Sequence, residues 1–274
     1  MSALLEMEPE QAPVRLDDQT VGELAAYFDD AEPEEILEWA IDRFGRRLAI
    51  FTSFQRETMV LLDMAHKINP DIRVITIDTG RLPEETFRMM ETVRERYGVN
   101  IEVFSPDADN VEKMVAEHGP NLFYRSVPLR LTCCYIRKSV PQQRALHGLD
   151  AWVTGLRREQ WATRANLRKM ELDHDHSGIL KLIPMADWPK ERVLEYIDRH
   201  NVPTHELYGK GFPSFGCEPC TRAVGAGEDP RSGRWWWETD APKECGMHCS
   251  IETGGFEHEA ESILGNLLGR DFRH

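Results

Sequence analysis

Six cysteines fall into three groups along the chain, and their spacing indicates two kinds of chemistry. Cys133 and Cys134 are adjacent, and Cys217 and Cys220 form a C-E-P-C motif far downstream. Four thiolates can hold zinc or an iron–sulfur cluster. Cys245 stands apart near the C-terminus, in the segment K-E-C-G-M-H. The first two groups therefore indicate a metal site, and Cys245 indicates a reactive thiol.

The adjacent pair Cys133 and Cys134 is the unusual part of this metal site. Neighbouring side chains on a helix point about 100° apart, so both reach one centre only where the backbone departs from a regular helix. Taken alone, the pair is equally well explained as two small buried apolar residues. Together with C-E-P-C downstream, the metal interpretation is favoured.

Composition and charge restrict the class of protein. The 274 residues suffice for one large α/β domain or two small ones. The N-terminus is acidic where a signal peptide would be basic, and no run approaches the roughly 20 apolar residues of a membrane span. We therefore expect a cytoplasmic protein without a membrane partner, whose thiols stay reduced. The net charge of -14 argues against nucleic acid as a partner.

Basic residues nevertheless gather between positions 125 and 169, in contrast to the acidic chain as a whole. Such a belt suggests a small anionic ligand, although a solvated helix surface is the alternative for any single arginine.

Short apolar runs alternate with segments of helical periodicity through most of the chain. This alternation predicts a doubly wound, mostly parallel α/β sheet. We expect residues 1–20 to be flexible, residues 21–237 to form the ligand- and metal-binding domain, and residues 238–274 to form a mobile C-terminal tail. The expected strands are 48–52, 74–78, 101–104, 151–155 and 179–184, and the expected helices are 33–43, 53–67, 83–97 and 189–200.

Ligands of such sheets bind at the carboxyl ends of the strands. Three polar segments follow strands here: T-S-F-Q-R-E, I-D-T-G-R-L and T-G-L-R-R-E-Q. Plain turns are the alternative for each. The candidate substrate-binding residues in or just after them are Ser53, Gln55, Asp78, Thr79, Gly80, Arg81, Arg157, Arg158 and Arg164.

Five motifs occur in an order that resembles the thioredoxin-dependent adenylyl-sulfate (APS) reductases of sulfate assimilation and cysteine biosynthesis. They are C-C-Y-I-R-K, G-L-R-R-E-Q-W-A-T-R, C-E-P-C-T-R-A-V, R-S-G-R-W-W-W-E and K-E-C-G-M-H. The resemblance runs from about residue 48 to 248 and implies an adenine nucleotide alpha hydrolase-like fold. It also implies one [4Fe–4S] cluster per chain, and as its ligands it implies Cys133, Cys134, Cys217 and Cys220.

The same resemblance implies a reaction. APS is reduced to sulfite and AMP through a Cys-S-sulfonate on Cys245, and thioredoxin or a glutaredoxin-like protein then supplies the electrons. His248 is expected to orient Cys245 or hold it as thiolate. Anionic oxygens surround the sulfur under attack, so cations are needed beside it. Lys138, Arg231 and Arg234 are the expected cations, whereas Cys249 lies outside the motif.

Several alternatives stay open at this point. One is a reductase of the 3′-phosphorylated substrate, or of both substrates, but no cation can be assigned from the sequence to the additional phosphate. An ATP-splitting enzyme of the same fold is disfavoured, because T-S-F-Q-R-E lacks the glycines of a pyrophosphate loop. A zinc-stapled binding module without enzymatic activity is the alternative from another class. The sequence does not decide whether the chain forms a homo-oligomer.

Overall fold

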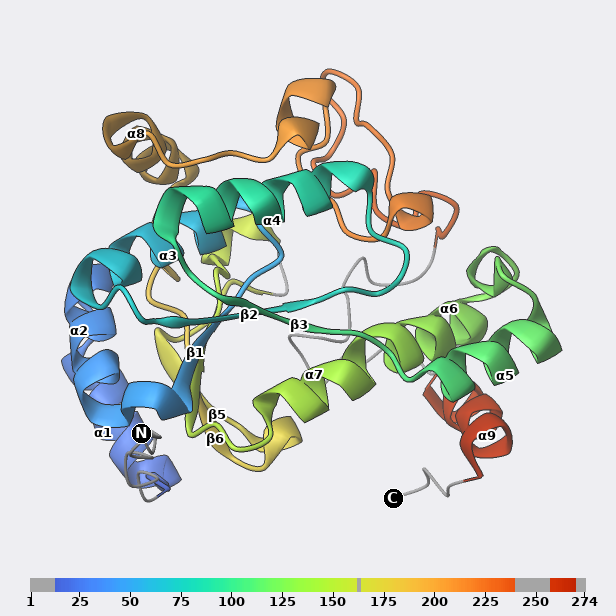
Figure 1. The fold of residues 1–274 in the computed structure, drawn as a ribbon, viewed down its shortest axis with the longest axis horizontal. Helices are drawn as coiled ribbons and strands as arrows, with labels where there is room; N and C mark the ends of the chain where they lie inside the picture. The colour runs from blue at the N-terminus through green and yellow to red at the C-terminus, as the bar shows by residue number, and fades with distance from the viewer. Residues whose placement is uncertain (1–12, 162–163, 240–256, 270–274) are drawn as a thin grey trace, which may run out of the picture.

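The computed structural model describes residues 13–161, 164–239 and 257–269, and its centre is a six-stranded sheet with helices on both faces (Figure 1). The strand order is β3-β2-β1-β4-β6-β5, and every neighbouring pair is parallel except β5 with β6. The predicted doubly wound, mostly parallel sheet is therefore confirmed. The strands are β1 (Leu48–Phe51), β2 (Arg73–Ile77), β3 (Ile101–Phe104), β4 (Ala151–Val153), β5 (Met170–Asp173) and β6 (Ile179–Leu182).

The helices include all four that the periodicity predicted, together with others that it did not. The first helix begins at Asp18, inside the segment expected to be flexible, while residues 1–12 lie outside the described ranges. The helices are α1 (Asp18–Tyr27), α2 (Pro33–Phe44), α3 (Arg56–Ile68), α4 (Glu84–Tyr97), α5 (Ala108–His118), α6 (Val127–Cys134), α7 (Val140–Leu146), α8 (Lys190–His200) and α9 (Glu257–Leu268).

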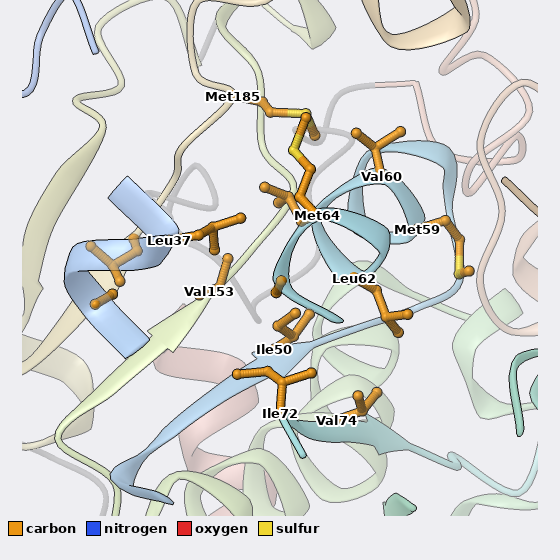
Figure 2. Close-up of a cluster of buried hydrophobic side chains, with 14 of the residues drawn as sticks. Leu37, Ile50, Met59, Val60, Leu62, Met64, Ile72, Val74, Val153 and Met185 are labelled. Carbon is orange, nitrogen blue, oxygen red and sulfur yellow. The ribbon is translucent and has the colours of Figure 1, made fainter. Parts of the chain in front are cut away.

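Each face of the sheet has its own apolar core, because successive strand residues point to opposite faces. In β1, Leu48 and Ile50 belong to the core formed with α2, α3 and α8, which Figure 2 shows in part. Ala49 and Phe51 point the other way and belong to the core that contains Ala145 and Leu146 of α7. A strand buried on both faces reads as a continuous apolar run, which is why L-A-I-F could be identified as a strand.

A third apolar cluster lies beside the sheet, where α5 and α6 pack against α9 (Figure 1). Met114 of α5 and Leu129 of α6 meet Leu264 and Leu267 of α9 in this cluster. The buried cysteines Cys133, Cys217 and Cys220 belong to the same cluster. Two segments far apart in the sequence are thereby brought together around these three cysteines.

The sheet has its topological switch point between β1 and β4. The strands β2 and β3 extend the sheet on one side of β1, whereas β4, β6 and β5 extend it on the other side. A crevice is expected at the carboxyl ends of these two strands. In the part of the chain that the structure describes, no helix combines the length and the apolar character needed to cross a membrane.

Candidate active site

A cavity of about 340 Å³ occupies this switch point, where the turns after β1, β2 and β4 converge. Its volume falls within the range of small-molecule sites. Most of the residues predicted to bind substrate contribute to its wall. They are Ser53, Gln55, Thr79, Arg157, Arg164, Arg231 and Arg234, together with the predicted catalytic residue Lys138.

Gly155 allows the turn after β4 to touch the first turn of α3. A Cβ atom at this position would lie 2.7 Å from Cβ of Glu57 and 2.8 Å from the backbone N of Thr58. Both distances are shorter than van der Waals contact, so a larger residue would force the two turns apart. Thr52 donates a hydrogen bond of 2.9 Å to the hydroxyl of Thr58, which ties the end of β1 to the same helix.

The arginines of the cavity are held by different partners. Arg157 is ion-paired with Glu57 at 3.0 Å and with Glu159 at 3.3 Å, so two carboxylates offset its charge. Arg234 is buried, donates to Thr221 Oγ1 at 2.5 Å, and lies over the ring of Trp235 at 4.6 Å. Among the described residues no carboxylate is ion-paired with Arg234, which leaves its guanidinium available to an anionic ligand.

All four cysteines of the predicted metal site line one small second cavity. Burial raises the pKa of Cys133 to about 12 and also raises the pKa of Cys220. Cys134 and Cys217 add to both shifts, which means that the four sulfur atoms are close enough to influence one another. Protons on such thiols are displaced when a metal binds, because the ligand is the thiolate.

The residues around this second cavity fit an iron–sulfur cluster. A [4Fe–4S] cluster takes one thiolate per iron, so its four ligands surround a cluster and not a single ion. Among the residues of known position, no group of three or more His, Cys, Asp or Glu side chains is arranged to hold a single metal ion. Lys138 and Arg137 lie near Cys133 and oppose the rise of its pKa, so their charges can offset that of the thiolates.

The backbone at the adjacent cysteines departs from a regular α-helix, as two neighbouring ligands require. Helix α6 ends at Cys134, and a π-helical turn over Tyr135–Ser139 follows directly and leads into α7. Single π-helical turns of this kind occur frequently at functional sites. This turn carries Lys138, so the same irregularity positions the cysteine pair and the predicted catalytic lysine.

Two residues connect the cavities. Lys138 lines both of them. Thr79 lines the first cavity, and its Oγ1 lies 3.2 Å from the sulfur of Cys217. The backbone N–H of Arg81 donates to the same oxygen at 3.2 Å, which leaves the hydroxyl proton of Thr79 for the sulfur. The cysteine site and the anion-binding cavity are therefore neighbours.

A buried ion pair links the helix that carries Cys133 and Cys134 to the segment that follows C-E-P-C. Arg130 of α6 donates to both carboxylate oxygens of Glu238, at 3.0 and 2.9 Å. Trp235, which accepts the Arg130 guanidinium over its ring at 4.8 Å, donates its backbone N–H to the carbonyl of Cys220. The helix that carries the adjacent cysteines is thus tied to the segment that follows C-E-P-C.

The other predicted residues lie elsewhere in the described part of the chain. Asp78 accepts from the backbone N–H of Gly80 at 2.8 Å and so forms the turn after β2. Arg81 lines the cysteine cavity, where its side chain donates to Asn121 at 2.8 Å. Arg158 points away from both cavities, since it donates to the carbonyl of Leu167 at 2.8 Å. Cys245 and His248 fall in 240–256, which lies outside the described ranges, as does Cys249.

Sequence reasoning did not find His205, which is buried behind the cavity wall. Its Nδ1 accepts from the backbone N–H of Leu207 at 3.3 Å, so Nε2 carries the proton and donates to Thr86 Oγ1 at 3.1 Å. Its ring lies 4.2 Å from the ring of Phe215. Thr86 and Phe215 both line the cavity, so His205 positions two parts of its wall.

Acidification should destabilise the protein through His205. Burial lowers its pKa from 6.5 to about 4, so the folded state disfavours the charged imidazole. The stability that the neutral ring contributes is complete above about pH 6.5 and is lost as the pH falls toward 4. Between pH 7 and pH 5 the wild type should lose about 2 kcal/mol more unfolding free energy than His205→Phe. Urea unfolding at both pH values measures this, and equal losses would contradict the assignment.

The phosphoadenosine phosphosulfate reductase domain matches residues 47–223, which include the three strand-end turns and all four cysteines of the second cavity. The chain belongs to this family. The predicted resemblance is therefore confirmed at the level of the family. The family region contains the whole sheet and most residues of the two cavities, whereas Arg231, Arg234 and Trp235 of their walls lie beyond it.

Curated relatives cover most of the chain. The adenosine 5′-phosphosulfate reductase of Burkholderia cepacia is 49% identical over 202 residues, which are 74% of this chain and 80% of the relative. The protein of the same name from Neisseria meningitidis is 44% identical over 222 residues, which are 80% of this chain and 90% of the relative. These family members are oxidoreductases by name.

Solved structures agree with the fold. The crystal structure of phosphoadenylyl-sulfate reductase from Candida auris, a phosphate complex, has a TM-score of 0.66 and 28% identity. The similarity covers 78% of this chain and all of the other. Yeast FAD synthetase, with a TM-score of 0.51 and 14% identity over 77% of this chain and 70% of the other, shares the fold alone.

Proposed function

We propose that this chain reduces adenylyl sulfate to sulfite and AMP, with a Cys-S-sulfonate on Cys245 as intermediate. The observation that carries the proposal is that Lys138 lines both the cationic cavity at the switch point and the cavity of four cysteines. The names of the relatives that the chain matches over most of its length support the same substrate.

In the first step the thiolate of Cys245 attacks the sulfur of APS, a sulfur–sulfur bond forms, and the bond to the phosphate oxygen breaks. AMP leaves with the electron pair. Negative charge builds on the leaving phosphate and the sulfonate oxygens, where Lys138 and Arg234 can stabilise it. Lys138 and Arg234 line the cavity, and Arg234 is fixed by Thr221 and Trp235.

In the second step a dithiol protein of the thioredoxin or glutaredoxin class attacks the sulfur of Cys245 and releases sulfite. Its second thiol then resolves the mixed disulfide and restores the Cys245 thiol, so the two electrons come from the dithiol. Cys133, Cys134, Cys217 and Cys220 would hold a [4Fe–4S] cluster, which when bound supplies a charged group that Lys138 and Thr79 can contact.

The proposal is tested by measuring sulfite release from APS by anaerobically purified protein with thioredoxin and its reductase. Sulfite and AMP in equal amounts are expected, and omission of thioredoxin should stop turnover after one equivalent of AMP. Release of pyrophosphate from ATP, or no reaction with APS in protein that retains its metal, would overturn the proposal in favour of another activity of this fold.

A further inference from the structure

The guanidinium of Arg234 is held in the wall of the first cavity by two neighbouring side chains. Its Nη1 donates to Thr221 Oγ1 at 2.5 Å, and the hydroxyl of Thr221 donates in turn to the carbonyl of Cys217 at 3.0 Å. Its Cζ lies 4.6 Å from the centre of the Trp235 ring. Thr221 and Trp235 therefore fix the position of the guanidinium, and a third contact determines which edge of it faces a ligand.

This third contact is with Gly216. A Cβ atom at Gly216 would lie 2.7 Å from Nη1 and 2.7 Å from Nη2 of Arg234, and 3.1 Å from Cζ. That point is equally far from the two terminal nitrogens and farther from the carbon that joins them. In a planar guanidinium it therefore lies at the open end between the nitrogens and not over the face. Because glycine has no side chain there, the end of Arg234 can pack against the backbone next to Cys217.

These contacts leave one edge of Arg234 for a ligand. Nη1 is bonded to Thr221, whereas Nε and Nη2 have no hydrogen-bond partner among the described residues. Neither of these two nitrogens is among the fully buried donors without a partner, and Arg234 lines the first cavity, so both are accessible from that cavity. Nε and Nη2 form the side edge of the guanidinium, which can donate two parallel hydrogen bonds to two oxygens of one oxyanion.

We propose that Gly216 is a positioning residue for the substrate and that it acts through Arg234. By receiving the end of the guanidinium, Gly216 turns the edge of Nε and Nη2 toward the cavity, where this edge binds two oxygens of the phosphosulfate. The inference rests on the proposed function for the identity of the ligand. Gly216 directly precedes Cys217, so one segment supplies a cysteine of the second cavity and the support for an anion-binding arginine of the first.

Alanine at position 216 is a selective probe of this role. Gly216 does not have a positive φ, so alanine can adopt its backbone conformation without strain. The three atoms nearest to the added methyl group all belong to the guanidinium of Arg234, which can move more easily than backbone can. Gly216→Ala should therefore displace Arg234 and leave the backbone at Cys217 in place. Gly225→Ala is the matched control, because its methyl group would come no closer than 3.7 Å, to the side chain of Glu228.

The test is a double-mutant cycle on the full-length, metal-loaded protein with ADP as the probe. ADP carries a phosphate where APS carries the sulfate, so it has a similar anionic end but no sulfur for a thiolate to attack. Calorimetry gives the dissociation constants of the wild type, Gly216→Ala, Arg234→Ala and the double variant. Each single variant should bind ADP roughly ten- to hundredfold more weakly, because a charge-assisted pair of hydrogen bonds is lost. The double variant should bind within about twofold of Arg234→Ala, because its methyl group displaces no guanidinium. Gly225→Ala should bind as the wild type does.

Four results would overturn the inference. No measurable binding of ADP by the wild type would mean that the cavity holds no such anion. A change of less than about twofold in Gly216→Ala would mean that Arg234 does not depend on Gly216. A double variant weakened by the product of the two single effects would mean that the two residues act independently. Loss of iron from Gly216→Ala would place the role of Gly216 at the cysteine site. Sulfite release from APS is measured separately, so failure of the proposed reaction leaves the four binding constants, and hence the decision on Gly216, unaffected.

Discussion

Replacement of Cys245 by serine will abolish sulfite formation from APS, by a factor on the order of 10⁴ or more. The serine hydroxyl cannot form the sulfonate that the dithiol later attacks. The described residues that line the cavity and the cysteine site lie elsewhere in the chain and are unchanged in this variant. Iron content and APS affinity should therefore stay near the wild-type values. The measurement is sulfite release with thioredoxin as reductant, alongside APS binding by calorimetry.

Cys249→Ser is the matched control for this prediction, because it removes a thiol only four residues away. Most of the activity should remain in that variant. If Cys245→Ser still turns over APS, or if Cys249→Ser is the inactive one, Cys245 is not the nucleophile.

Loss of either cysteine of C-E-P-C will remove the metal and weaken the fold. Anaerobically purified wild type should be brown and contain about four iron atoms per chain. Cys217→Ser and Cys220→Ser should each bleach the protein and lower its unfolding free energy by several kcal/mol, since the energy of metal binding is also folding energy. Iron analysis, the visible spectrum and urea unfolding measure these effects.

The control here is again Cys249→Ser. Cys249 is not one of the four cysteines assigned to the metal site, so this variant should keep its iron. Unchanged iron content in both C-E-P-C variants would refute the four-thiolate assignment. Zinc in place of iron in a colourless, anaerobically prepared protein would favour a structural zinc site and the non-enzymatic alternative.

The sheet could be predicted from the sequence because a strand that is buried on both faces consists of consecutive apolar residues. The run L-A-I-F of β1 has no polar residue, and the helices after β1, β2 and β6 show clear periodicity. Helices α6 and α7 were not predicted. Pro128 and Pro141 begin their first turns, and the π-helical turn between them shifts the apolar positions, so no regular helical repeat crosses this region.

Helix α9 and strand β5 were missed for related reasons. The apolar side of α9 includes Leu264 and Leu267, which are buried in a cluster with residues of α5 and α6 far away in the sequence. Strand β5 lies at the edge of the sheet and pairs only with β6, so M-E-L-D keeps polar residues. Short elements whose burial depends on distant partners leave little pattern in the sequence.

The candidate site also contains residues that could be predicted from the sequence and residues that could not. Ser53, Thr79 and Arg157 could be grouped in advance, because the ends of parallel strands meet at one edge of a sheet. Arg56 and Tyr208 could not, since they are 152 positions apart and meet only through tertiary packing. Arg158 was grouped with Arg157 by proximity in sequence, yet its side chain bonds to Leu167 away from the cavity.

The most direct test of the proposed mechanism is to incubate the wild type with APS in the absence of any reductant. The intact mass should rise by one SO₃ per chain, one AMP should be released per adduct, and peptide mapping should place the adduct on Cys245. Addition of thioredoxin should then remove the adduct as sulfite. An adduct on Cys249 or on one of the four clustered cysteines, or AMP release without any adduct, would contradict the mechanism at its central step.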